Sequence, residues 1–302
     1  MGVQSGLKAE LKTRALAVAD MAAVTSAAAP ENGERRLRAY IKSGLPGGLG
    51  WLAREPQKRA DIRLWFPGAQ SVLVCAFACG ANPPNLSPEE LQKLIASRGG
   101  RNRALKSNFL KYPDLKIAAY FALHDYHETI KAALSALLAD IRAQYPGLEG
   151  KVFCDDSPVL EKAYAEKAGL GWTGKNTLLL TPQFGSRILL GGIALNAGLE
   201  PDAAPQFAGC GDCEVCINAC PGGALSPYRL NPAKCCSYWT TACKDELPEE
   251  IAAACANRAA GCDACQDCCP VNAAAHAIDR NLNNALCEGP KSGLALGAAV
   301  KA

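Results

Sequence analysis

Residues 210–221 read CGDCEVCINACP, with cysteines at Cys210, Cys213, Cys216 and Cys220 and a proline directly behind the last of them. This is the C-x2-C-x2-C-x3-C-P pattern of bacterial ferredoxins. Two residues between successive thiolates let one tight loop present the sulfurs to different irons of a 4Fe–4S cube. In two-cluster ferredoxins the fourth cysteine binds the other cluster. The pattern therefore predicts a ferredoxin-like module near the C-terminal end.

A second cysteine run lies further along the chain, and we read it as Cys262-x2-Cys265-x3-Cys269-Pro270. It repeats the C-x3-C-P ending but supplies only three cysteines in this reading. A fourth ligand must come from elsewhere, and we expect Cys235 or Cys236 to supply it.

Two 4Fe–4S clusters account for these cysteines. We expect one cluster on Cys210, Cys213, Cys216 and, by crossover, Cys269, and the other on Cys220, Cys235, Cys262 and Cys265. Paired C-x2-C knuckles also bind structural zinc, which is the main alternative, and disulfides are the other. The two C-x3-C-P endings favour iron–sulfur clusters, because zinc knuckles need no such tail.

Length and composition are those of an ordinary globular protein. The 302 residues predict about two domains, and 49% hydrophobic residues are enough for a core. The net charge of +3 is no nucleic-acid signature by itself. The first fourteen residues do not resemble a signal peptide, and the longest apolar run, Ile188–Leu195, is too short to span a bilayer. We therefore expect a cytoplasmic protein with reduced thiols and no membrane contact.

Hydrophobic patterning predicts an α+β fold, with a first domain over residues 1–205, the cluster module over 206–275 and a tail over 276–302. The expected helices are 5–16, 34–43, 124–145 and 159–168, and the expected strands are 17–24, 71–77, 116–122, 152–154, 177–180 and 188–195. Asp156 or Ser157 is expected to cap the helix over 159–168, with Pro158 in its first turn. Arg98, Arg101, Arg103 and Lys106 form a basic patch that we interpret as a solvated face.

One apparent nucleotide motif is misleading. Gly169-x4-Gly174-Lys175 imitates a phosphate-binding loop, but Asn176 stands where magnesium needs Ser or Thr, and a helix precedes it. A helix C-cap followed by a hairpin explains these residues equally well. The three histidines, His124, His127 and His276, are interpreted as structural.

Several stretches resemble the epoxyqueuosine reductase family. The strongest is DDSPVLEKAYAEKAGLGWTGKN over 155–176, followed by CCSY over 235–238 and GCDACQDCCPVN over 261–272. Weaker matches are HDYH over 124–127, GWL over 50–52 and PGAQSV over 67–72.

The resemblance implies a cobalamin-dependent iron–sulfur enzyme that reduces epoxyqueuosine to queuosine at the wobble position of certain tRNAs. It implies a nitroreductase-like cobalamin-binding domain that receives electrons from two 4Fe–4S clusters. An external electron donor and a monomer are expected. The C-x-S-Y motif favours Cys235 over Cys236 as the cluster ligand. The cofactor contacts expected are Arg59, Asp155, Thr173, Gly174, Lys175 and Ser237.

The same resemblance points to Asp155 as the catalytic acid, with Asp156 as its competitor. Removal of an epoxide oxygen as water needs protons, and a partly desolvated carboxyl with a raised pKa can donate them. The alternative role for Asp155 is a helix cap. In an extended segment the two carboxylates would point in opposite directions, with Asp155 facing the corrin.

Three functions remain open at this point. Besides the tRNA reductase, a related corrinoid reductase of the dehalogenase kind could act on a small molecule, and the module alone could carry electrons. The chain lacks the C-terminal helical-repeat extension of longer family members and the Arg usually found before Tyr120, which bears on the tRNA substrate.

Overall fold

The computed structural model describes residues 3–44, 48–80, 87, 89–90, 93–94, 116–122, 125–243, 245 and 247–275. The basic patch at Arg98–Lys106, His124, His276 and the tail over 276–302 lie outside these residues. Within the described residues, no helix has the length and apolar character that crossing a membrane requires.

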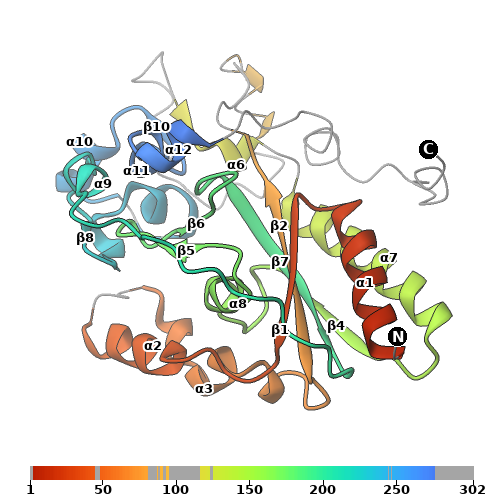
Figure 1. The fold of residues 1–302 in the computed structure, drawn as a ribbon. Coiled ribbons are helices and arrows are strands. Elements are labelled where there is room, and N and C mark those ends of the chain that lie inside the picture. The colour runs from red at the N-terminus through yellow and green to blue at the C-terminus, as the bar shows by residue number, and fades with distance from the viewer. Residues whose placement is uncertain are drawn as a thin grey trace.

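The helices and strands follow the chain from the N-terminus to the cluster module (Figure 1). The helices are α1 Val3–Leu16, α2 Gly33–Lys42, α3 Pro56–Ala60, α6 Ala119–Ala122, α7 Tyr126–Gln144, α8 Glu161–Lys167, α9 Val215–Asn218, α10 Glu249–Cys255, α11 Ala264–Asp267 and α12 Pro270–Ala274. Short turns of 3-10 helix are η1 Gly50–Ala53, η2 Ile62–Leu64 and η3 Pro232–Lys234, and η4 Tyr238–Ala242 is a π-helical turn. The strands are β1 Met21–Ser26, β2 Ser71–Ala78, β3 Lys116–Ile117, β4 Gly150–Phe153, β5 Trp172–Thr173, β6 Leu179–Leu180, β7 Ile188–Leu195, β8 Leu225–Ser226, β9 Arg229–Leu230 and β10 Arg258–Ala260.

A four-stranded antiparallel sheet in the order β1-β2-β7-β4 forms the centre of the larger part. Every residue of β2 is buried, because both faces of the sheet are covered. Leu73, Cys75 and Phe77 pack against α1 and α7, which lie side by side in Figure 1, while Val72 and Val74 face the side of α8. The apolar runs predicted at 71–77 and 188–195 are thus confirmed as central strands, and the helix over 124–145 is confirmed as α7.

Three local predictions were wrong. Residues 116–122 are not one strand: β3 has two residues, pairs with β10 of the cluster module, and is followed by α6. The strand expected at 17–24 starts later, at Met21, because residues 17–20 form the turn that follows α1. Helix α8 begins at Glu161, and its N-cap is Leu160, which makes no side-chain capping bond. Asp156 and Ser157 therefore do not cap it.

The residues that imitate a phosphate-binding loop form a helix end and a hairpin. Gly169 has φ +79 directly after α8, a conformation that glycine adopts without strain. Strands β5 and β6 then pair antiparallel. The rejection of a nucleotide site on these residues is consistent with this geometry.

Candidate active site

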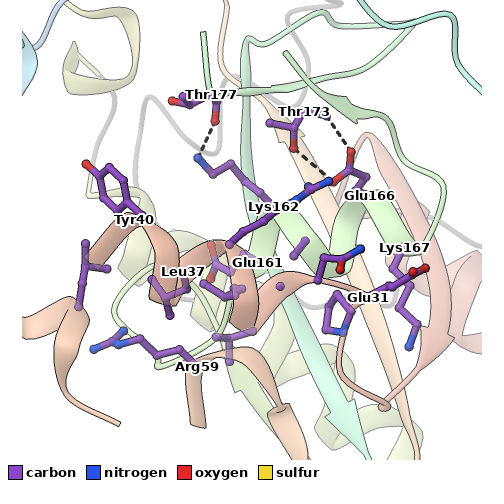
Figure 2. A pocket seen from close by; sticks show the side chains of 18 of the residues that line it. Glu31, Leu37, Tyr40, Arg59, Glu161, Lys162, Glu166, Lys167, Thr173 and Thr177 are labelled. Carbon is purple, nitrogen blue, oxygen red and sulfur yellow. Dashed lines mark hydrogen bonds and ion pairs between the residues drawn. The ribbon is translucent and has the colours of Figure 1, made fainter. Parts of the chain in front are cut away.

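A cavity of about 700 Å³ lies between α2, α3, α8 and the turn after β4 (Figure 2). Of the cofactor contacts expected from the sequence, Arg59, Asp155 and Thr173 line it. A neighbouring cavity of about 730 Å³ shares Tyr40, Lys162 and Thr173 with the first. The two hollows therefore form a continuous region large enough for a sizeable ligand.

Polar side chains of α8 reach across this cavity. The Lys162 ammonium donates a hydrogen bond to the Thr177 carbonyl oxygen at 2.7 Å, and Glu166 accepts from the backbone N–H and the hydroxyl of Thr173 (Figure 2). Burial lowers the pKa of Lys162, because removal from water disfavours the charged ammonium. Lys162 and Glu166 thus each bind a residue of the β5–β6 segment at the cavity.

Arg59 carries an unused donor at the cavity. Its guanidinium stacks over the Trp51 ring at 4.8 Å from the ring centre, and Nη2 donates to the Trp51 carbonyl oxygen at 3.3 Å. Its Nε is buried with no hydrogen-bond partner among the described residues. Because a buried unpaired donor is costly, this nitrogen fits a ligand acceptor.

Asp155 forms a polar cluster with the start of α7. Its Oδ2 accepts a hydrogen bond from the Tyr126 hydroxyl at 2.9 Å and lies 3.0 Å from Nε2 of His127. Nδ1 of the same imidazole lies 2.8 Å from Oδ1 of Asp125. Since carboxylates accept and do not donate, both ring nitrogens must carry protons to satisfy both contacts. His127 in this arrangement is an imidazolium.

Electrostatics agree with that protonation state. The hydrogen bond from His127 lowers the pKa of Asp155, and burial only partly opposes this. The same bond raises the pKa of His127, with Asp125 contributing further. The raised pKa expected for Asp155 was therefore wrong: His127 stores the proton, and Asp155 is ionised between the two pKa values.

The two adjacent aspartates differ, although both face α7. The Asp155 side chain is 62% exposed toward the cavity, and Asp156 forms an ion pair with Lys131 of α7. The expected extended segment is wrong, because Asp155 has φ +50, in the left-handed region. Asp155 and Asp156 therefore have different environments because the chain turns at Asp155, and not because side chains alternate along an extended strand.

A third cavity, of about 330 Å³, contains cysteines from both runs. Cys220, Cys235, Cys262 and Cys265 line it together, as do Cys236 and Ser237. The Arg258 Nε donates to the Cys262 sulfur at 3.1 Å. Burial, followed by the charges of Cys262, Cys235 and Cys220, raises the pKa of Cys265. The four cysteines expected to hold one cluster therefore border the same hollow, which suits an iron–sulfur cluster.

The remaining cysteines of the runs gather separately. Cys210, Cys213, Cys268 and Cys269 all act electrostatically on Cys216, although burial is the larger reason that the Cys216 pKa is raised. Cys236, which also lines the third cavity, packs with Cys255 and Ile251 in a small core.

Close backbone contact brings Cys235 to the first run. A Cβ on Gly222 would lie 2.0 Å from the Lys234 carbonyl oxygen, so only glycine allows this approach.

Several site residues were missed or were assigned elsewhere by sequence. Tyr126 and His127 had been read as ordinary helix residues, and Glu161, Lys162 and Thr177 had no assigned role. Their signal was their position inside or beside the family-like stretches. Gly174 and Lys175 lie in the β5–β6 hairpin, where the Lys175 carbonyl oxygen accepts from the Tyr228 N–H, and Ser237 lies at the cysteine cavity.

Comparison with known proteins identifies relatives for both parts. Residues 59–156 match the family described as epoxyqueuosine reductase QueG, and residues 209–272 match the 4Fe-4S double cluster binding domain. An epoxyqueuosine reductase from Leadbetterella byssophila is 34% identical over 253 residues, which is 84% of this chain and 75% of the relative. One from Burkholderia pseudomallei is 34% identical over 81% of this chain and 61% of its own length.

Solved structures of epoxyqueuosine reductases have a similar fold. A crystal structure of an epoxyqueuosine reductase with an epoxyqueuosine-modified tRNA-Tyr stem loop superposes with TM-score 0.73 at 28% identity, over 89% of this chain and 66% of the other. The reductive dehalogenase NpRdhA shares the fold, with a TM-score of 0.52 at 14% identity. The superposition covers 91% of this chain and 33% of the NpRdhA chain.

Proposed function

The chain belongs to the epoxyqueuosine reductase family, and from this premise we propose that it reduces epoxyqueuosine in tRNA to queuosine. The observation that carries the proposal is the Asp155–His127 pair at the edge of a large cavity, since this reaction needs both a bound cofactor and a proton source. We further propose a monomer in the cytoplasm that takes electrons from an external donor.

The reaction consumes two electrons and two protons per epoxide, and yields an alkene and water. His127 holds one proton on Nε2, and Asp155 can receive it and present it to the departing oxygen in the cavity, while the second proton comes from solvent. Tyr126 keeps the Asp155 carboxylate oriented through its hydroxyl. Asp155 is thus the proposed catalytic acid, and His127 recharges it.

Residues 1–205 are proposed to form a nitroreductase-like domain that binds cobalamin. The proposed binding site is the cavity lined by Arg59, Asp155 and Thr173. The size of the adjoining cavities and the unpartnered Arg59 Nε support a large polar ligand. When bound, cobalamin supplies a strongly reducing cobalt centre. Gly174, Lys175 and Ser237 stay proposed contacts.

We propose two 4Fe–4S clusters in the module over residues 206–275, one held by Cys210, Cys213, Cys216 and Cys269 and the other by Cys220, Cys235, Cys262 and Cys265. We expect about eight irons per chain after anaerobic reconstitution. Cys235→Ser and Cys269→Ser should each lose about four irons, whereas Cys236→Ser and Cys268→Ser should keep all of them. Iron and zinc analysis of the four variants tests this, and iron near four in the unmodified chain, or zinc in place of iron, contradicts it.

The pH dependence of turnover follows from the raised pKa of His127. Because the pKa of His127 is raised, its proton is present below that value, and turnover should fall as pH rises through it. His127→Gln should lower the rate and remove this alkaline limb. Initial rates of both forms across the neutral and alkaline range measure the effect, and an unchanged limb in the variant would exclude His127 as its source.

Expression of this chain in a host lacking the reductase tests the function itself. Mass analysis of tRNA nucleosides should show queuosine in place of epoxyqueuosine. Persistent epoxyqueuosine, despite full loading with clusters and cobalamin, would favour a small-molecule substrate instead.

A further inference from the structure

Glu161 contacts the backbone of the proposed catalytic residue. It stands in the first turn of α8 and lines the same cavity as Asp155. Its Oε1 accepts the backbone N–H of Asp155 at 2.5 Å. Within the described residues, no ion pair reaches this carboxyl. Its carboxyl is therefore directed at the turn that carries Asp155.

The turn needs such support. With φ +50, Asp155 adopts a left-handed conformation, which is uncommon for residues other than glycine. Strained backbone of this kind persists only where its surroundings hold it. The next N–H, that of Asp156, is bound to the Cys154 carbonyl oxygen at 2.6 Å. Two successive amides are thus fixed, one by the chain itself and one by Glu161.

The conformation decides where the carboxylate goes. From this turn Asp155 reaches Tyr126 and His127 at the start of α7, an element far away in sequence. If the turn relaxed into an extended conformation, the carboxylate would leave both partners. We propose that Glu161 is a positioning residue that holds Asp155 against His127 through the Asp155 N–H, an inference whose catalytic consequence rests on the proposed function.

The protonation behaviour of Glu161 suits this role. Burial raises its pKa to about 8, which keeps much of it neutral beside the Asp155 carboxylate at neutral pH. A carboxyl oxygen accepts a hydrogen bond in either protonation state, so the contact survives titration.

The test compares Glu161→Gln, which retains an acceptor oxygen, with Glu161→Met, which has similar length and none. The readout is the pKa of His127, followed by NMR of labelled imidazoles in the cluster-loaded enzyme without cobalamin. The chain has three histidines, and loss of one signal in His127→Gln assigns the resonance. Glu34→Gln, at an exposed pair with Arg38 on α2, is the control.

We expect Glu161→Gln and Glu34→Gln to keep the raised His127 pKa, and Glu161→Met to return it to the ordinary imidazole range. In the complete enzyme, kcat of Glu161→Met should fall about 100-fold with a smaller change in KM, because the acid is displaced. The Gln variant should retain most of its turnover.

A wild-type His127 pKa in Glu161→Met overturns the proposal, as does a lowered one in Glu161→Gln. A measurement without variants guards against misfolding: the Asp155 amide should exchange slowly with solvent in the unmodified protein, and exchange at the rate of an open loop also overturns it. Both readouts are independent of epoxyqueuosine, so failure of the proposed function leaves them interpretable.

Discussion

Asp155→Asn is expected to lower the turnover of epoxyqueuosine by about 10²–10⁴-fold, the usual contribution of general acid catalysis. Asparagine keeps the size of the side chain and can accept from the Tyr126 hydroxyl, but its amide cannot relay the proton held by His127. Cluster content and cobalamin binding should match the unmodified enzyme. Iron analysis, cobalamin absorbance and product formation, measured separately, distinguish lost chemistry from lost cofactor.

Asp156→Asn is the matched control. Its carboxylate forms an ion pair with Lys131, and exposed pairs contribute about 0–1 kcal/mol to stability. Turnover should therefore stay near that of the unmodified enzyme. If Asp156→Asn were inactive and Asp155→Asn active, the catalytic assignment would be off by one residue.

Arg187→Met is expected to destabilise the attachment of the cluster module by about 3–5 kcal/mol, the cost of breaking a buried ion pair. The Arg187 side chain, just before β7, is 6% exposed and donates to Oδ2 of Asp263 at 2.8 Å, and Asp263 is 11% exposed. A second bond from its guanidinium reaches Asp267 of α11. Methionine would leave Asp263 buried without its cation.

The position of Asp263 makes this loss specific. It lies between Cys262 and Cys265, and its Oδ2 also accepts the Ala119 N–H at 2.8 Å. Denaturant unfolding under anaerobic conditions, together with iron content, should show the loss of stability and loss of iron from the cluster proposed on these cysteines.

Arg63→Met provides the comparison, because Arg63 pairs with Asp61 at an exposed site and should cost about 0–1 kcal/mol. Equal stabilities of the two methionine variants would show that Arg187 does not hold the module.

Local patterns in the sequence were sufficient for much of the architecture. The continuous apolar strands at 71–77 and 188–195 and the apolar stripe of the helix over 124–145 depend on periodicity alone, and each was predicted correctly without knowledge of its neighbours. The spacing of the cysteine runs likewise predicted the double-cluster domain that residues 209–272 match. The family-like stretch over 155–176 identified the region of the site for the same reason, because its motif is contiguous.

Tertiary structure decided the rest. Strand β3 exists only because β10 pairs with it, and residues 119–122 became helix instead of continuing the strand. The ionisation of Asp155 depends on His127, which is distant in sequence, and its left-handed backbone is held by Glu161 across a turn. The role of Arg187 required two aspartates from the cluster module. Charge, burial and strain are set by neighbours in space, whereas spacing and periodicity are set along the chain, and this difference separates what the sequence determined from what the fold added.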